Sequence, residues 1–411
     1  MNEDSSTTQT TPLATAISGL SMRGIGPAFM GGRIADLAVH PANKSTWYLA
    51  VGSGGVWKTT NAGTTWSPIF DDQQSFSIGC VTLDPNQPDI VWVGTGEAVS
   101  GRHVAWGDGV YRSRNGGATW DHMGLRQSEH IAEILVDPRD SDVVYVAAEG
   151  PLWSGDGQRG VYKTTNGGES WHQALRIDAD TGVTSLAFAP DDPDTLYAAA
   201  YQRRRRVWSF LGGGPGSAIY KTSNGGDSWR EITHGLPKVD MGKIGLAVTP
   251  ASPDTVYATV EADEETRGFY RSTDRGESWE RRNKYISGGT GPHYYQEIFA
   301  SPTDPERVYQ VDVFVHWTPD GGKTIQRLET GRTKHSDNHL VWIDPDDGDH
   351  LLIGADAGLY ETFDHGESFR HVPNLPISQF YRVATDNAEP FYNILAGAQD
   401  LGTLYGPSRT T

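Results

Sequence analysis

The stretch Thr164-Thr165-Asn166-Gly167-Gly168-Glu169-Ser170-Trp171 decides the fold, because its pattern occurs seven times along the chain. The shared pattern is Ser/Thr-x-Asn/Asp-x-Gly-x-Ser/Thr, followed by an aromatic or large apolar residue. Its Asn/Asp positions are Asn61, Asn115, Asn166, Asn224, Asp274, Asp320 and Asp364, spaced 44 to 58 residues apart. A repeat of this length, with several short strands in each unit, predicts a β-propeller with one blade per repeat.

Each unit carries a second marker, a turn with proline that precedes an apolar run. Asp84-Pro85 comes before Ile90-Val91-Trp92-Val93, and Asp137-Pro138 comes before Val143-Val144-Tyr145-Val146. Continuous apolar runs are typical of strands that are covered on both faces. The sequence therefore predicts an all-β, seven-bladed propeller over residues 22–376, with four strands per blade. A polar leader (1–21) precedes it, and a partial further unit (377–411) follows it.

The repeated motif itself predicts a structural turn, without a catalytic role. An Asn or Asp side chain can accept hydrogen bonds from backbone amides of its own turn, and glycine supplies the left-handed backbone conformation. The aromatic residue after the motif then anchors the turn against the blade.

These repeats resemble Asp boxes, also known as BNR repeats. Asp boxes occur in sialidases, in xyloglucan-cleaving glycoside hydrolases with paired seven-bladed propellers, and in the sortilin luminal domain. The chain is similar along nearly its whole length to microbial sortilin-like, glycosyl-hydrolase-like propeller proteins. The likeness rests on Gly31-Gly32-Arg33, Trp92-Val93-Gly94-Thr95-Gly96-Glu97, His335-x-Asp337-x-His339 and Gln399-Asp400-Leu401-Gly402-Thr403. The resemblance implies the fold much more strongly than it implies an activity.

The composition adds an independent observation, a strong excess of acidic residues. There are 52 Asp and Glu against 34 Lys and Arg, of which only nine are Lys, and the net charge is −18. This balance is typical of proteins adapted to high salt, and an ordinary acidic protein is the alternative. Nucleic acid is excluded as a partner, since phosphate binding needs a basic face. The basic run Arg203–Arg206 is expected in a loop, paired with acidic neighbours.

The single cysteine and the two ends of the chain give only weak indications of cellular location and domain organisation. Cys80 is the only cysteine, lies in an apolar strand and is expected to be a buried thiol. No stretch approaches the length of a membrane span. The acidic start of the leader favours a cytoplasmic protein, with export as the alternative that related propellers suggest. Residues 377–411 predict either the start of a second propeller in cis or strands that close the first ring, and we favour the first.

Propeller geometry predicts where a ligand binds. The loops that enter each innermost strand and the loops between second and third strands meet at one mouth of the central channel. Polar and aromatic residues on these loops are the candidate ligand-binding groups, together with one tryptophan from an insertion discussed below. They are Arg33, His130, Glu149, Trp208, Tyr295, Asp312 and Asp356, with Glu261 as a further carboxylate of the same rim.

A trio of side chains at the mouth has the composition of a metal site. His335, Asp337 and His339 alternate at i, i+2 and i+4, so an extended strand would project all three from one face. Imidazole and carboxylate ligands suit zinc or manganese, and a divalent metal is the cofactor that this pattern predicts. The alternative is a solvated polar strand that lines the channel.

Glu97 and Asp400 are the carboxylates predicted to act as catalytic acid and base. Glycoside cleavage needs two carboxyl groups about 5–9.5 Å apart, flanking the scissile bond. The resemblance argues against a complete site, because the xyloglucanases place a catalytic Asp just before a Gly-Gly pair in the first blade. The corresponding stretch is Val51-Gly52-Ser53-Gly54-Gly55, which has no carboxylate. The alternative is that Glu97 and Asp400 are structural groups or hydrogen-bond a ligand.

An insertion in the fourth unit, residues 201–217, contains the basic run, Trp208, Phe210 and three consecutive glycines. This composition predicts a flap over the mouth, in which Trp208 stacks on a sugar, packs on a peptide or contacts a second propeller.

The sequence leaves two functions open. The first is a glycan-directed protein that binds or cleaves a polysaccharide, with Trp208 and Tyr295 as platforms; if it is an enzyme, it is a glycoside hydrolase. The alternative is a non-catalytic, sortilin-like scaffold for a protein or peptide.

Overall fold

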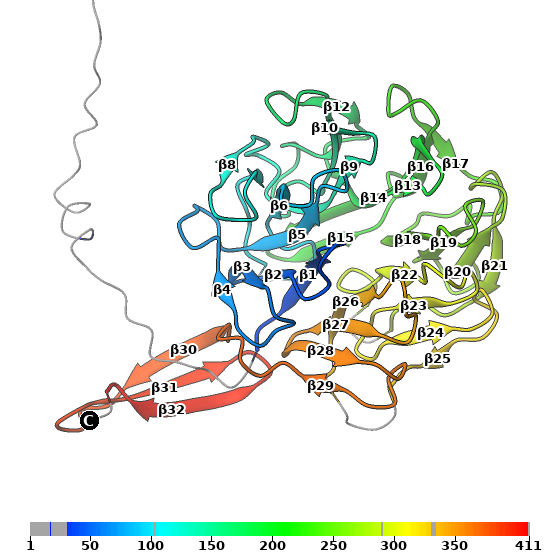
Figure 1. Ribbon diagram of the computed structural model, residues 1–411. Helices are drawn as coiled ribbons and strands as arrows, with labels where there is room; N and C mark the ends of the chain where they lie inside the picture. Colours follow the sequence, from blue (N-terminus) through cyan, green and yellow to red (C-terminus); the bar gives the residue numbers. More distant parts are fainter. Residues whose placement is uncertain (1–16, 18–30, 102–103, 289–290, 330–333, 410–411) are drawn as a thin grey trace, which may run out of the picture.

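The computed structural model describes residue 17 and residues 31–101, 104–288, 291–329 and 334–409. Apart from Ile17, the expected leader at 1–21 lies outside the described residues. Every regular element of the described ranges is a β-strand, and the strands form sheets arranged in a ring (Figure 1). None of the described segments is a helix long and apolar enough to cross a membrane. The all-β propeller predicted from the sequence is confirmed.

The described residues form seven sheets with the same antiparallel path, in which each strand pairs with the next one along the chain. The first three sheets are β1 (Ile34–Val39), β2 (Trp47–Val51), β3 (Gly55–Thr59) and β4 (Ser67–Pro68); β5 (Ile78–Leu83), β6 (Val91–Thr95), β7 (Val110–Ser113) and β8 (Asp121–His122); and β9 (Ile131–Asp137), β10 (Asp140–Ala148), β11 (Gly160–Thr164) and β12 (His172–Leu175).

The fourth sheet contains an extra strand, and an eighth, three-stranded sheet follows the ring. The fourth to seventh sheets are β13 (Thr181–Ala189), β14 (Asp192–Arg206), β15 (Ser209–Gly212), β16 (Ala218–Thr222) and β17 (Arg230–Ile232); β18 (Ile244–Val248), β19 (Val256–Val260), β20 (Gly268–Ser272) and β21 (Glu280–Asn283); β22 (Ile298–Ala300), β23 (Val308–Gln310), β24 (His316–Thr318) and β25 (Gln326–Arg327); and β26 (Asn338–Ile343), β27 (Leu351–Ala355), β28 (Gly358–Thr362) and β29 (Arg370–His371). The last sheet is β30 (Phe380–Thr385), β31 (Asn393–Ala398) and β32 (Gly402–Pro407).

The ring closes where the seventh sheet packs against the first. Ile34 and Leu37 of β1 share one buried cluster with Leu340 of β26 and Leu352 of β27. The second strands of the sheets are almost wholly buried, as in Trp47–Val51 of β2, because neighbouring sheets cover both faces. This burial accounts for the continuous apolar runs of the sequence.

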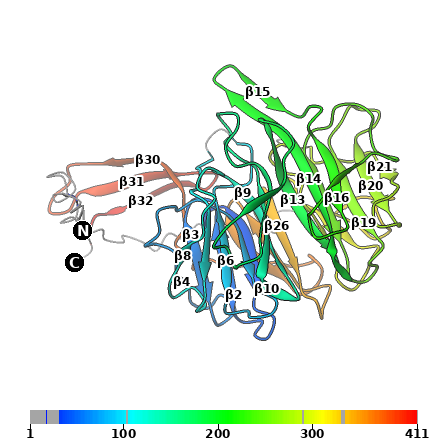
Figure 2. The same ribbon diagram turned by 90° about the horizontal axis from the view of Figure 1, so that it is seen from above.

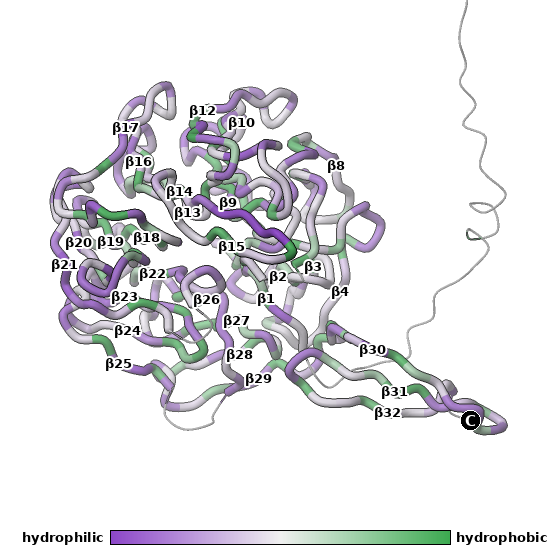
Figure 3. Tube along the Cα trace, turned by 180° about the vertical axis from the view of Figure 1, so that it is seen from behind, coloured by the Kyte–Doolittle hydropathy of each residue, from purple (hydrophilic) through white to green (hydrophobic). Residues whose placement is uncertain are grey.

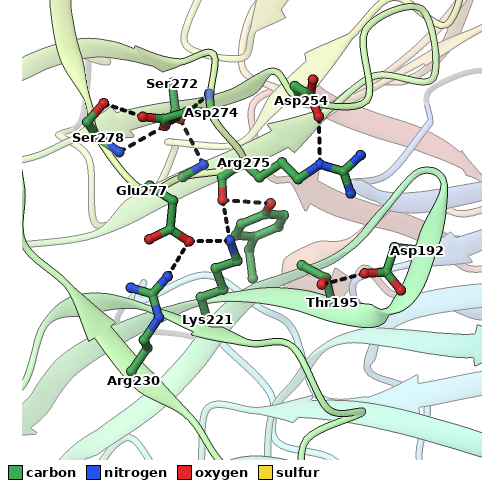
Figure 4. Close-up of polar contacts among 12 residues, drawn as sticks. Asp192, Thr195, Lys221, Arg230, Asp254, Ser272, Asp274, Arg275, Glu277 and Ser278 are labelled. Atoms are coloured by element: carbon green, nitrogen blue, oxygen red, sulfur yellow. Dashed lines mark hydrogen bonds and ion pairs between the residues drawn. The ribbon is translucent and has the colours of Figure 1, made fainter.

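The seven repeated motifs form tight turns between the third and fourth strands, named the box turns here. In the fourth sheet, Thr222 Oγ1 accepts the backbone N–H of Gly226 at 3.0 Å, and Asn224 Oδ1 accepts the N–H of Ser228 at 3.0 Å. Gly226 has φ = +86°, a conformation that glycine adopts without strain. Figure 4 shows the equivalent turn of the fifth sheet, where Asp274 bonds Ser272 and Ser278.

Each of several box turns is also clamped by the preceding sheet. Lys221 of β16 and Tyr197 of β14 donate to the carbonyl of Arg275, in the box turn of the next sheet, at 2.7 and 3.0 Å (Figure 4). Lys163 and Tyr145 bind the carbonyl of Gly225 in the same way, at 2.6 and 2.8 Å. The Lys and Tyr positions therefore connect successive sheets at their outer ends.

At the inner end, two partly buried carboxyl groups bridge neighbouring sheets. Asp36 of β1 accepts the N–H of Val81 on β5 at 2.9 Å, and Glu133 of β9 accepts the N–H of Leu186 on β13 at 2.8 Å. Both line the central channel, a cavity of about 370 Å³. Burial raises the pKa of Asp36 to about 6 and that of Glu133 to about 8. Cys80 lies beside the same channel and is buried, as expected.

Two features project from the ring. The 201–217 insertion is a β-hairpin in which the end of β14 pairs with β15, Arg203 opposite Gly212 and Arg206 opposite Ser209 (Figure 2). The expectation of a loop for the basic run is therefore wrong, and the run is the hydrophilic stretch beside β15 in Figure 3. The sheet β30–β32 extends away from the ring and has exposed apolar side chains on its strands (Figures 1 and 3).

We predict that Thr222→Val destabilises the fold, because the isosteric change leaves the N–H groups of Asn224 and Gly226 without their acceptor. The expected loss of unfolding free energy is about 1–3 kcal/mol, measured as a shift of the urea midpoint. Thr233→Val, at an exposed position just after β17, is the control. Equal midpoints for the two variants would contradict the role of the box turn.

We also predict that stability falls as the pH rises from about 4.5 to 8, because Glu133 keeps its proton in the folded protein and loses it in the unfolded chain. Each unit of raised pKa is equivalent to about 1.4 kcal/mol. Glu133→Gln keeps an acceptor for Leu186 and should flatten this slope and raise the urea midpoint at pH 8. Glu169→Gln, at an exposed box-turn position, removes the same charge and should leave the slope as it is. An unchanged slope in Glu133→Gln would refute the assignment.

Candidate active site

The mouth of the channel is organised around the guanidinium of Arg33. Arg33 precedes β1 of the first sheet and is 8% exposed. Its Nη1 lies 3.0 Å from Oε1 of Glu97, which follows β6, and its Nε lies 2.8 Å from Oδ1 of Asp356, which follows β27. Arg33 thus joins the first, second and seventh sheets, as the loop rule predicted from the sequence. Its two carboxylate partners outweigh the effect of burial and raise the pKa of Arg33.

Asp356 connects this cluster to His339 and Asp400. His339 Nε2 lies 2.7 Å from Asp356 Oδ1. Burial would raise the pKa of Asp356, but the hydrogen bond from His339 and the charges of His339 and Arg33 hold it well below its usual range. For Asp400, on the turn between β31 and β32, burial together with the hydrogen bond and charge of Asp356 raises the pKa. Two neighbouring carboxyl groups therefore have their pKa values pushed in opposite directions.

Tyrosine rings surround this cluster. The Arg33 guanidinium lies 5.4 Å from the centre of the Tyr294 ring, and Tyr294 contacts His339 edge to face. Tyr381 of β30 is 59% exposed, and partial burial and the charge of Asp400 raise its pKa. Tyr295 is 1% exposed and donates from its hydroxyl to Asp337 at 2.6 Å. The expectation of Tyr295 as a stacking platform is wrong because its ring is buried.

Glu97 occupies the space above the first-sheet loop that lacks a carboxylate. A Cβ added to Gly52 would lie 2.0 Å from Oε1 of Glu97, so glycine is required at this position. The backbone N–H of Gly52 donates to the carbonyl of Arg33 at 3.0 Å. A carboxylate from the second sheet thus lies against the first-sheet loop of residues 51–55, which has no carboxylate of its own.

His130 and Glu149 belong to an adjoining buried cluster. His130 Nδ1 lies 2.8 Å from the carbonyl of Glu97, and burial and the charge of Arg203 lower its pKa to about 3. Arg203 Nη1 lies 2.8 Å from Glu149 Oε2, in an ion pair whose geometry is not that of a hydrogen bond. The expected pairing of the basic run with acidic neighbours is found here and at Arg204, 2.7 Å from Asp180.

The metal trio does not converge on one point. Asp337 has φ = +67°, and β26 starts only at Asn338, so the chain is not extended across the three residues. His339 bonds Asp356, Asp337 accepts from Tyr295, and His335 Nδ1 lies 2.9 Å from the carbonyl of Ser336. Among the described residues no group of three or more His, Cys, Asp or Glu side chains is arranged to hold a metal ion. The shared face expected from the i, i+2, i+4 spacing is therefore wrong.

Two other predicted residues lie apart from the Arg33 cluster. Asp312 accepts hydrogen bonds from the Tyr285 hydroxyl at 3.0 Å and the Gly288 N–H at 2.8 Å, and is 4% exposed. Trp208 lies at the tip of the β14–β15 hairpin and is 80% exposed. The base of that hairpin is fixed to the loop after β6, where Arg203 and Arg205 bind Ser100. The expected flap is thus a hairpin with a buried ion pair at its base.

Sequence reasoning missed Tyr294, Tyr381 and the structural role of Arg203. Tyr294 is adjacent to Tyr295 on the same loop, so the loop rule that selected Tyr295 could also have selected Tyr294. Tyr381 lies in a strand that the sequence placed outside the first propeller. Arg203 belongs to a run of four arginines, and nothing in the sequence distinguishes it from the other three, although it is the only one of them that is wholly buried.

We predict that Arg33→Met strongly destabilises the protein, because Glu97 and Asp356 would remain as buried charges without their partner. The loss of unfolding free energy should be about 3–5 kcal/mol, measured by urea denaturation at pH 7. Arg114→Met, at an exposed box-turn position, is the matched control. Equal losses in the two variants would contradict the central role of the Arg33 ion pairs.

Comparisons with known proteins place this site in the context of two kinds of propeller. A family model described as "Sortilin, neurotensin receptor 3" matches residues 108–268. A xyloglucanase from Hypocrea jecorina is 25% identical over 418 residues, covering 81% of this chain and 47% of its own length. The chain spans less than half the length of the curated relatives that were compared.

Solved structures agree with this assignment at the level of the fold. A GH74 xyloglucanase from Xanthomonas campestris superposes with a TM-score of 0.67 and 14% identity, covering 93% of this chain and 60% of its own. YCF48, solved bound to D1 peptide, gives a TM-score of 0.54 and 13% identity, covering 82% of this chain and 94% of its own. The resemblance expected from the sequence is confirmed: the chain is similar to sortilin-like and xyloglucanase-like propeller proteins, and its architecture is glycosyl-hydrolase-like.

Proposed function

We propose that the protein binds a β-glucan chain of the xyloglucan type at the Arg33 cluster. The observation that carries this proposal is the Arg33 cluster, in which one guanidinium binds Glu97 and Asp356 and the exposed carboxyl of Asp400 lies next to Asp356. Sugar hydroxyls donate to carboxylates and accept from guanidinium groups, and an aromatic face covers the apolar side of a sugar ring. The xyloglucanases among the relatives supply the ligand class.

The same cluster supports a hydrolytic version of the proposal. A pair of titratable groups with separated pKa values is the arrangement that assigns an acid and a base. Asp400, with its raised pKa, would give a proton to the leaving oxygen. Asp356 is in direct contact with Asp400, too near to flank a glycosidic bond with it, whereas Glu97 binds a different nitrogen of Arg33. Glu97 is therefore the second carboxylate of this version.

A sortilin-like peptide scaffold is the second candidate. It is favoured by the sortilin family match over residues 108–268, which include the third sheet and the β14–β15 hairpin. The exposed Trp208 and Val207 at the hairpin tip are the surface that a peptide would cover in this version. Peptide binding that Trp208→Ala abolishes and Asp400→Asn leaves intact would favour this candidate.

We predict that Asp400→Asn folds normally, because the residue is exposed, and weakens the binding of xyloglucan oligosaccharides at least tenfold. Calorimetric titration at pH 6 measures the binding, and reducing-sugar release in low and in multimolar salt measures cleavage. Asp121→Asn, an exposed position on β8, is the matched control. Unchanged binding in Asp400→Asn, or no binding by the wild-type protein, would refute the proposal.

A further inference from the structure

A groove of about 820 Å³ lies beside the mouth, between the second and third sheets. Its walls come from the loop before β5, the loop between β6 and β7, and the turn that leads into β9. These are the same two kinds of loop that carry the Arg33 cluster. Six of the lining residues matter for what the groove can bind: Gln74, Phe76, Trp106, Asp108, Arg126 and Glu129. We name it the Phe76–Trp106 groove.

Two large aromatic rings of this groove are left in water. Phe76 is 61% exposed and Trp106 is 70% exposed, whereas Trp92 of the same sheet is completely buried. Aromatic rings bury a large area when a partner covers them, and exposed rings at the edge of a cavity are typical of ligand sites. The groove therefore has apolar faces for a ligand that is itself partly apolar.

The polar groups of the groove include two carboxyl groups, Asp108 and Glu129, and donors such as Gln74 and Arg126. Oδ2 of Asp108 accepts from the Tyr111 hydroxyl at 2.8 Å, and Arg126 Nη1 lies 3.5 Å from the same oxygen. The other oxygen, Oδ1, is shielded from solvent and has no hydrogen-bond partner within the described part of the chain. The carboxyl groups outnumber the single guanidinium, which disfavours an anionic ligand.

The backbone of the groove is fixed in place. Glu129 has φ = +55°, an uncommon conformation for a residue with a side chain, and its carbonyl accepts the N–H of Gly107 at 2.7 Å. A Cβ on Gly96 would lie 1.8 Å from that carbonyl, so the turn before β9 packs directly on the loop after β6. A strained position that its surroundings hold in place is typical of binding sites.

We propose that the Phe76–Trp106 groove is a second saccharide-binding site, which takes part of a neutral oligosaccharide between the two rings. Neutral sugars combine an apolar ring face with hydroxyl groups that both donate and accept, and this matches the exposed rings and the mixture of donors and acceptors in the groove. The ligand class rests on the proposed function, but the site is separate from the Arg33 cluster. Trp106 lines the groove, whereas Glu97 lines the central channel.

The test is calorimetric titration of the whole chain with a xyloglucan oligosaccharide. Wild-type protein should show two sites, and Trp106→Ala should lose one of them, with at least a tenfold fall in that affinity. Phe363→Ala removes an exposed aromatic ring from the box turn of the seventh sheet and is the matched control. Circular dichroism of each variant checks the fold, which these exposed positions should leave unchanged.

The two proposals fail in distinguishable ways. Two intact sites in Trp106→Ala would overturn the groove proposal, while the loss of one site in Asp400→Asn would still support binding at the mouth. If the wild-type protein shows a single binding site, and Trp106→Ala removes it while Asp400→Asn retains it, the groove proposal is supported and the proposal of binding at the mouth is refuted. A groove that binds a lysine-rich peptide and no saccharide would overturn the proposed ligand class. Absence of binding by the wild-type protein would overturn both proposals.

Discussion

The carbonyl groups of the box turns hold the ring together at its outer end. Each such carbonyl belongs to a turn that its own Ser/Thr and Asn/Asp side chains fix, and it accepts hydrogen bonds from the preceding sheet, as Gly225 does from Lys163 and Tyr145. The turn is therefore both a local structure and a docking point for its neighbour. Because the contact recurs between several pairs of neighbouring sheets, it fixes how those sheets sit side by side, and loops from distant parts of the sequence meet at one mouth.

The fold could be predicted because its determinants are local and repeated. Thr222, Asn224 and Gly226 lie within five positions, and their hydrogen bonds depend on that spacing alone. The apolar runs that form the second strands could be predicted equally well, since burial on both faces needs continuous hydrophobic residues. The hairpin was less predictable: four arginines suggest a loop, but Arg203 is buried against Glu149, a partner 54 positions earlier.

The site was only partly predictable, because it depends on contacts between sheets. The loop rule selected Arg33, Glu97 and Asp356, and the structure brings them together. The rule could not show that Arg33 neutralises both carboxylates, that Tyr295 is buried, or that Asp337 turns the chain before β26. The alternation that suggested a metal site assumes an extended backbone, and one left-handed residue is enough to break it.

The contact between Asp356 and Asp400 joins two parts of the molecule that share few other polar groups. Asp356 belongs to the ring and Asp400 to the appended sheet β30–β32, so one of the carboxyl groups at the mouth comes from outside the seven sheets of the ring. Two carboxyl groups in contact repel each other when both are ionised, and this repulsion adds to burial in raising the pKa of Asp400. The surface that a ligand meets at the mouth is therefore shared between the ring and the appended sheet.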